Sequence, residues 1–208
     1  MLDAGNLSVF LLATIMLNIT PGPDMLYVAT RSISQGRMAG IVSSLGIAAG
    51  CLVHTILAAF GLSALLTYSS MAFEVVKYAG AAYLIYLGVK MLIDKTPQNE
   101  LSALPRSSLQ KLFQQGAVTN MLNPKVGIFF LAFLPQFASP SSDTFTLQVI
   151  FLGLLFNTSG TIVNILVAVI FGFAGNFIQS NKRFWTFQRY LCASVFIGLG
   201  IRLGLTKR

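Results

Sequence analysis

Long runs of hydrophobic residues, separated by short polar segments, dominate the pattern along the chain. Six runs are long enough to cross about 30 Å of hydrocarbon at about 1.5 Å per residue, as a membrane-spanning helix must. The pattern therefore predicts an all-α integral membrane protein. Its six transmembrane helices are expected at about 6–30, 39–67, 72–93, 115–137, 146–176 and 184–205.

The composition supports a single transmembrane domain over residues 1–208. Hydrophobic residues make up 55% of the chain and charged residues 10%, against about 25% charged in a soluble domain. No polar segment approaches the roughly 50 residues that a separate soluble domain needs. The net charge of +8 is spread through the short segments between apolar runs, which is typical of a membrane protein and not of a nucleic-acid-binding one.

The basic residues also indicate an orientation. Nine lie in the odd-numbered connections and four on the opposite side. The positive-inside rule then places the odd-numbered connections in the cytoplasm and both termini in the periplasm. The basic pair at the C-terminus, Lys207 and Arg208, argues in the other direction.

The longest polar segment, residues 94–114, divides the chain into two groups of three helices. We expect it to be a cytoplasmic linker. With three spans in each half, any internal repeat must be inverted in the membrane, as in many transporters. The halves carry a faint echo: Asn18 lies three residues before Pro21, and Asn120 lies four residues before Pro124.

The first unusual stretch runs from Asn18 to Asp24 inside the first apolar run. Two prolines should break that helix near Thr20–Pro23, and such breaks survive at membrane depth only inside protein or beside a cavity. A half-helix that restarts after Pro21 would present free N–H groups to a carboxylate, while Asp24 could hold an ammonium group or a proton. The alternative is a simple kink with Asp24 at the cytoplasmic interface. The candidate substrate-binding residues here are Asn18, Thr20, Pro21, Gly22, Pro23 and Asp24.

A second break is expected at Pro124. Lys125 follows it and precedes an apolar run, where an uncompensated ammonium is expensive and should pair or face water. Asp24 is the expected partner, and snorkelling of Lys125 to the interface is the alternative. The candidate substrate-binding residues here are Asn120, Asn123, Pro124 and Lys125.

Two further groups of polar residues share a helix face. Gly46, Gly50 and His54 are spaced by four, so a neighbouring helix can approach the glycines. The only histidine of the chain, His54, could exchange protons near neutral pH or serve as a packing residue. In the fifth run, hydrogen bonding between helices is the favoured reading over substrate contact. Its candidate secondary lining residues are Asn157, Thr161 and Asn164.

The chain lacks the motifs of several other classes. It has no Walker A loop, no nucleophile elbow and no His-Glu-x-x-His, so we expect neither ATP hydrolysis nor proteolysis and no enzyme. One histidine and two separated cysteines do not make a metal-ligand cluster. No metal and no cofactor are therefore expected.

Four blocks resemble the LysE/RhtB family of amino-acid exporters and run in the family's order. They are Thr20-Pro-Gly-Pro-Asp24, Gly46-Ile-Ala-Ala-Gly50-x3-His54, Gly80–Gly88, and Asn123-Pro-Lys125 with Phe129–Phe137. The resemblance implies an exporter of the bacterial inner membrane, driven by the proton motive force. It favours small neutral amino acids such as threonine, homoserine or leucine, with basic ones as the other family substrates.

The residues and the resemblance together suggest a mechanism. Freed N–H groups near Pro21–Pro23 would bind the substrate carboxylate, and Asp24 its ammonium group. Lys125 would keep Asp24 ionised in the empty site, and His54 is a second candidate for proton handling. The partners are then an amino acid, protons and the lipid bilayer, and the glycine faces suit a homo-oligomer as well as internal packing. The rivals are an exporter of another small solute or a metal ion, and a non-transporting membrane scaffold.

Overall fold

A computed structural model describes residues 4–68, 70–93, 106–139, 142–180 and 182–205. Within these ranges the chain contains helices and no strand, which confirms the predicted fold class. The elements are α1 (Ala4–Ile19), α2 (Pro23–Gln35), α3 (Arg37–Tyr68), α4 (Ser70–Ile93), α5 (Leu109–Met121), α6 (Pro124–Ile128), a π-helix η1 (Phe129–Phe133), a 3-10 helix η2 (Leu134–Phe137), α7 (Phe145–Ser180) and α8 (Lys182–Leu205).

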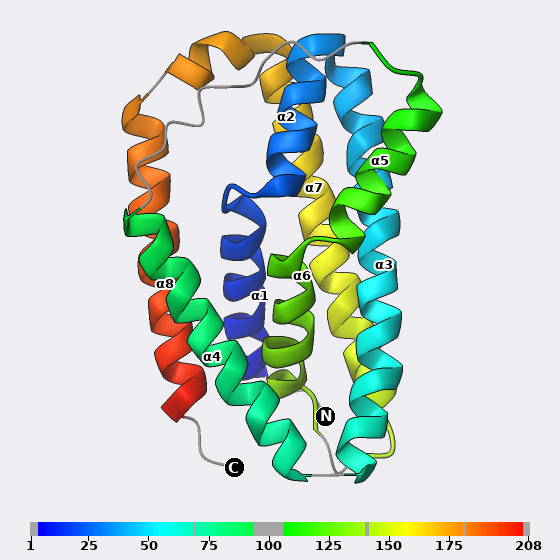
Figure 1. The fold of residues 1–208 in the computed structure, drawn as a ribbon, viewed down its shortest axis with the longest axis vertical. Coiled ribbons are helices and arrows are strands. Elements are labelled where there is room, and N and C mark those ends of the chain that lie inside the picture. Colours follow the sequence, from blue (N-terminus) through cyan, green and yellow to red (C-terminus); the bar gives the residue numbers. More distant parts are fainter. Residues whose placement is uncertain (1–3, 69, 94–105, 140–141, 181, 206–208) are drawn as a thin grey trace.

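The same order of elements occurs twice. Each half has a broken helix, then a long helix (α3 or α7), then a helix of 24 residues (α4 or α8). In Figure 1, α1 lies below α2, whereas α5 lies above α6, so the two broken helices run in opposite directions. This is the arrangement predicted from three helices per half: two inverted repeats with broken helices 1 and 4.

The breaks fall where the prolines predict them. α1 and α2 meet at 48° across a break at 20–22, and α5 and the helix that starts at Pro124 meet at 46° across a break at 122–123. Pro23 and Pro124 each occupy the first turn of the helix that restarts, where the missing N–H of proline costs nothing. The breaks therefore divide each of these two spans into half-helices.

The six expected ranges each hold a helix. By length and composition, 37–61 and 145–174 can each cross a membrane, and each broken pair counted as one span brings the number to four among the residues described. α4 contributes a shorter apolar stretch, Tyr78–Ile93, and packs along α8. α5 already begins at Leu109, so the end of the predicted linker is helical, while 94–105 lie outside the described residues.

α3 forms the spine of the bundle and packs along both α5 and α7. Its glycines allow the close approach to α5: a Cβ atom on Gly46 would lie 2.1 Å from the carbonyl oxygen of Phe113, and one on Gly50 would lie 2.4 Å from that of Ala117. The predicted glycine face is thus an internal packing face. It holds His54, one turn further along, against the second break.

Candidate functional site

The two breaks meet inside the bundle at about half its height (Figure 1). Lys125, at the start of α6, donates hydrogen bonds to backbone oxygens at the end of α1. Asp24, at the start of α2, receives hydrogen bonds from Asn120 at the end of α5 and Asn123 in the second break. Each half therefore supplies one charged side chain that reaches the break of the other half.

Asp24 accepts both of these amide hydrogen bonds on one oxygen. Its Oδ2 lies 2.8 Å from Asn120 Nδ2 and 2.9 Å from Asn123 Nδ2. Its Oδ1 and the Oδ1 of Asn120 are buried and have no hydrogen-bond partner among the residues described. The 13 residues of α2 span about 20 Å, so Asp24 lies well inside the bundle and not at the end that a simple interfacial kink would give.

Lys125 does not bind Asp24 directly. Its ammonium donates to the carbonyl oxygens of Leu17 at 3.1 Å and Thr20 at 3.0 Å, and no ion pair links the two charged groups in the described structure. The Leu17 oxygen can accept from Lys125 because residue 21 is a proline. In a continuous helix the N–H of residue 21 would bind this oxygen, and proline has no N–H. Gly22 allows the approach, since a Cβ there would lie 3.0 Å from Lys125 Nζ.

Pro23 frees a second carbonyl in the same way. The residue four positions before it is Ile19, whose oxygen accepts a hydrogen bond from the side-chain amide of Gln188 on α8. An unpaired backbone oxygen at this depth would cost on the order of several kcal/mol. The end of α1 is thus held by one side chain from α6 and one from α8.

Pro124 frees a third carbonyl, that of Asn120. Nε2 of His54, on α3, lies 2.9 Å from this oxygen, which also accepts from the backbone N–H of Asn123 at 2.9 Å. A carbonyl only accepts, so Nε2 carries the hydrogen. His54 is therefore placed behind the break, next to Gly127, and contacts Asp24 only through Asn120.

The half-helices correspond position by position. Pro23 and Pro124 each open a half-helix, and Asp24 and Lys125 are each the second residue. The expected alignment of Pro21 with Pro124 is therefore wrong, because the first break has three residues and the second has two. With the correct alignment, a carboxylate in one half takes the place of an ammonium in the other.

Asn18 and Asn120 correspond as well, each being the penultimate residue of its half-helix. Asn120 donates to Asp24, whereas Asn18 donates across to α7, to Ser159 Oγ at 3.1 Å and to the Phe156 oxygen at 3.5 Å. The two halves thus use the same position for different contacts.

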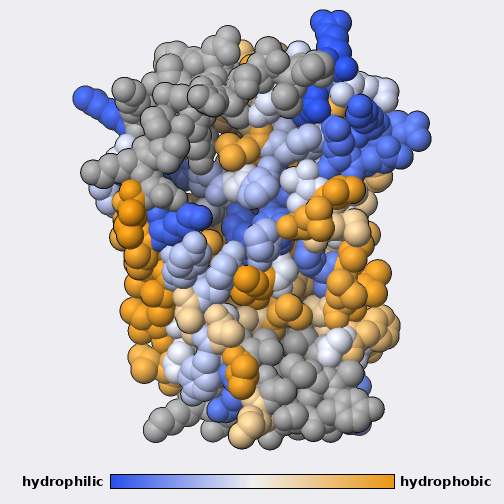
Figure 2. Space-filling model, in the orientation of Figure 1, coloured by the Kyte–Doolittle hydropathy of each residue, from blue (hydrophilic) through white to orange (hydrophobic). Residues whose placement is uncertain are grey.

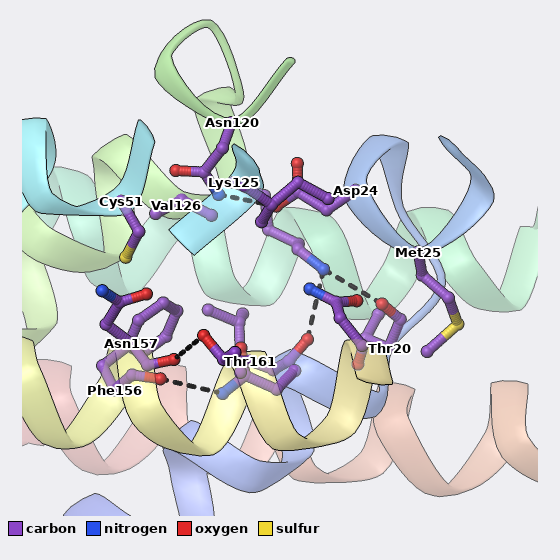
Figure 3. Close-up of a pocket in the computed structure, with 15 residues that line it drawn as sticks. Thr20, Asp24, Met25, Cys51, Asn120, Lys125, Val126, Phe156, Asn157 and Thr161 are labelled. Carbon is purple, nitrogen blue, oxygen red and sulfur yellow. Dashed lines mark hydrogen bonds between the residues drawn. The ribbon is translucent and has the colours of Figure 1, made fainter. Parts of the chain in front are cut away.

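A cavity of about 30 Å³ lies between the breaks and α7 (Figure 3). It brings together eight of the predicted residues. Pro21, Gly22, Pro23, Asn123, Pro124 and His54 are outside its lining and act on the residues that line it. The cavity is lined by Leu17, Asn18, Thr20, Asp24, Met25, Ile47, Cys51, Asn120, Lys125, Val126, Phe156, Asn157, Gly160, Thr161 and Asn164.

The polar residues of α7 include one that makes the predicted hydrogen bond between helices. Asn157 donates to the Ala48 oxygen of α3 at 3.2 Å, and Thr161 donates to the Asn157 oxygen at 2.7 Å. Both also line the cavity with Asn164. The hydrogen bond from Asn157 to α3 confirms the prediction of bonding between helices, and contact of these residues with a substrate stays a prediction.

Several residues of the site were missed from sequence. Met25, Ile47, Cys51 and Phe156 line the cavity, but as apolar residues in apolar helices they carry no signal. Gln188 gives none either, because only the fold brings it to α1. The Leu17 oxygen, in contrast, could have been identified, since it lies four residues before a proline.

The cavity is too small to hold an amino acid. Pockets that bind small molecules measure about 300–1,000 Å³, which is at least about ten times the 30 Å³ found here. Figure 2 shows hydrophilic residues in the middle of one face of the molecule, between two hydrophobic flanks. An amino acid therefore does not fit the cavity as it stands in this structure.

Inverted halves with broken helices that meet around a polar cavity define a membrane transporter. The LysE type translocator model matches residues 15–207, and the chain belongs to this family. It is a transporter and not an enzyme.

Related proteins are found along most of the chain. An uncharacterized membrane protein of Bacillus subtilis, YrhP, is 30% identical over 92% of this chain and 94% of its own length. The homoserine/homoserine lactone efflux protein of Salmonella typhimurium is 34% identical over 63% of this chain and 64% of its own length. The leucine efflux protein of Klebsiella pneumoniae is 26% identical over 95% and 94%. No solved structure matches.

Proposed function

We propose that the protein exports small neutral amino acids across the bacterial inner membrane, driven by the proton motive force. The observation that carries this proposal is the pair of buried, unpartnered oxygens at the meeting point of the two breaks, Asp24 Oδ1 and Asn120 Oδ1. Buried acceptors without a donor are costly. A ligand that brings N–H donors and a positive charge, such as an α-ammonium group, relieves that cost.

The substrate carboxylate is proposed to bind at the start of α2. Gly22 is the N-cap of this helix and offers no side-chain hydrogen bond, whereas Asn123 caps α6 by accepting from Lys125 N. The first-turn amides of α2 belong to Asp24 and Met25, and both residues line the cavity. An uncapped helix start attracts a carboxylate through its free N–H groups and its dipole.

The remaining lining favours a neutral side chain. Leu17, Met25, Ile47, Val126 and Phe156 supply apolar surface around the cavity. Asp24 is the only carboxylate among the lining residues, and we assign it to the α-ammonium group. A lysine or arginine substrate would bring a second cation without a second counter-charge, which is expensive at this depth.

The proton motive force is large enough to export an amino acid that has accumulated in the cell, but not to build a steep gradient. One proton that moves across about 100 mV yields about 2.3 kcal/mol, enough for a gradient of about 50-fold. The positive-inside pattern supports cytoplasmic odd-numbered connections, with both termini in the periplasm. The substrate then enters from the side where Arg37 and Arg106 lie and leaves on the other.

The test is transport by the purified protein in proteoliposomes. Vesicles loaded with labelled leucine, threonine, homoserine or lysine are diluted into buffer with and without an imposed pH gradient. We expect release of the neutral amino acids to be faster with the gradient and lysine to be released slowly. Equal release from protein-containing and empty vesicles would refute the proposal.

Two rival functions are less well supported. For a metal-ion exporter, no group of three or more His, Cys, Asp or Glu side chains occurs in the described part of the chain. A scaffold would have no ligand to bind the unpartnered oxygens in the cavity, so these oxygens would only lower its stability. An exporter of another small zwitterion remains compatible with the site, and the vesicle assay with a panel of solutes would identify it.

A further inference from the structure

The ammonium of Lys125 occupies a position that other transporters reserve for a bound cation. Carbonyl oxygens freed at a helix break, at the negative end of a half-helix, commonly hold the coupling ion of a transporter. Here the freed oxygens of Leu17 and Thr20 hold Lys125 Nζ at 3.1 and 3.0 Å. The cation at this place is therefore part of the chain.

This contact joins the two halves. Leu17 and Thr20 belong to the first broken helix, and Lys125 belongs to the second. The end of α1 has one other side-chain tie of the same type, the neutral amide of Gln188 on the Ile19 oxygen. Of these two ties, only the one from Lys125 can lose a proton.

We propose that Lys125 carries the coupling proton, and that its charged form locks the empty transporter closed by binding the end of α1. The inference rests on the proposed function, since it explains how a proton gradient would drive export. Loss of the proton turns a charge-assisted contact into a weaker neutral one. The half-helices that border the cavity can then separate.

The order of steps follows from the positions of the charges: the start of α2 binds the substrate carboxylate, and Asp24 is the one carboxylate of the lining near both the substrate ammonium and Lys125. Release of a proton from the –NH3+ group of Lys125 to the cytoplasm leaves –NH2 and opens the cavity, and the substrate ammonium then binds at Asp24 and takes the place of the second cation. After the amino acid leaves on the outer side, the amine takes up a periplasmic proton and restores the lock. One proton enters for each amino acid exported. Two titratable groups of the described structure face Lys125, Asp24 on α2 and Cys192 on α8. Cys51 and His54, both on α3, face Asp24.

Transport by Lys125→Gln in proteoliposomes tests this. Exchange of labelled for unlabelled substrate needs no net proton movement, so we expect it to continue at a reduced rate. Gradient-driven export should fall at least about tenfold, the factor that one charge-assisted hydrogen bond is worth. The matched control is Gln188→Met, which removes the neutral tie from the same helix end and should keep its dependence on the pH gradient.

A second measurement does not depend on the substrate. Cys51 lines the cavity and is buried, so its reaction with N-ethylmaleimide reports opening, in a Cys192→Ala background. At one fixed pH, Cys51 in Lys125→Gln should react at least about tenfold faster than in the parent, because one charge-assisted hydrogen bond is lost. Cys51 in Gln188→Met should react more slowly than in Lys125→Gln.

The outcomes separate the inference from the function. If Lys125→Gln keeps gradient-driven export, or loses exchange and export together while Cys51 labelling is unchanged, Lys125 is not the coupling lock. If the parent protein moves no amino acid but the labelling difference is found, the proposed substrate is wrong and the lock stands. Equal labelling of the parent and Lys125→Gln overturns the lock.

Discussion

The imidazole Nε2 of His54 lies 2.9 Å from the backbone oxygen of Asn120. This oxygen has lost its helical donor to Pro124, and the side chain of the same asparagine donates to Asp24. The histidine therefore fixes the backbone of the residue that orients the carboxylate. His54 therefore acts on the cavity through Asn120, which indicates a positioning role.

Replacing His54 by glutamine or leucine distinguishes positioning from proton transfer. The side-chain amide of glutamine can donate to the Asn120 oxygen as Nε2 does, so His54→Gln should keep most of the transport activity. His54→Leu leaves the oxygen with the Asn123 N–H as its remaining donor, and the loss of one hydrogen bond, about 0.5–1.5 kcal/mol, should raise the KM for substrate by roughly two- to tenfold. Equal loss in both variants would show that the ring itself carries a proton.

Asp24→Asn should weaken recognition of the substrate ammonium group. A hydrogen bond to a charged group contributes about 1.5–3 kcal/mol, so binding of leucine should weaken by about 10- to 150-fold. Isothermal titration with detergent-solubilised protein measures it directly. The control is Asp143→Asn, which removes an exposed carboxylate near the start of α7 and should have no effect. Full transport by Asp24→Asn would remove this residue from the mechanism.

The α3–α5 contact predicts opposite effects for two glycine substitutions in one helix. A Cβ on Gly50 would overlap the Ala117 oxygen at 2.4 Å, whereas one on Gly61 would meet nothing within 4 Å. Gly50→Ala should destabilise by about 1–3 kcal/mol, as overpacking does, and Gly61→Ala should stabilise by up to about 1 kcal/mol through helix propensity. Thermal unfolding in detergent checks both, and equal shifts would contradict the close packing.

A second carboxylate in the cavity should admit a basic substrate. Thr161 lines the cavity from α7, and Thr161→Asp would supply the counter-charge that a lysine side chain lacks. We expect lysine export relative to leucine to rise by at least about tenfold, in line with one charged hydrogen bond. Thr161→Asn, similar in shape and neutral, is the control. No gain for lysine would indicate that the substrate side chain does not point towards α7.

Much of the fold follows from local rules, and the exceptions are instructive. Prolines at 21, 23 and 124 predict the breaks, because their effect acts within one helical turn. The expected contact between Asp24 and Lys125 was inferred from charge alone, and freed backbone oxygens compete for the ammonium. Which donor reaches which oxygen depends on packing between helices that are far apart in the sequence, so Gln188 gave no signal.

The unequal lengths of the two breaks have a consequence for comparing the halves. Within a helix, one extra residue rotates everything that follows by about 100°, which would turn a lining residue away from its cavity. In an irregular turn the extra residue is absorbed locally. The halves of this chain can therefore differ by one residue at the break and still present Asp24 and Lys125 at equivalent places. An alignment of the two halves without a gap will miss this correspondence.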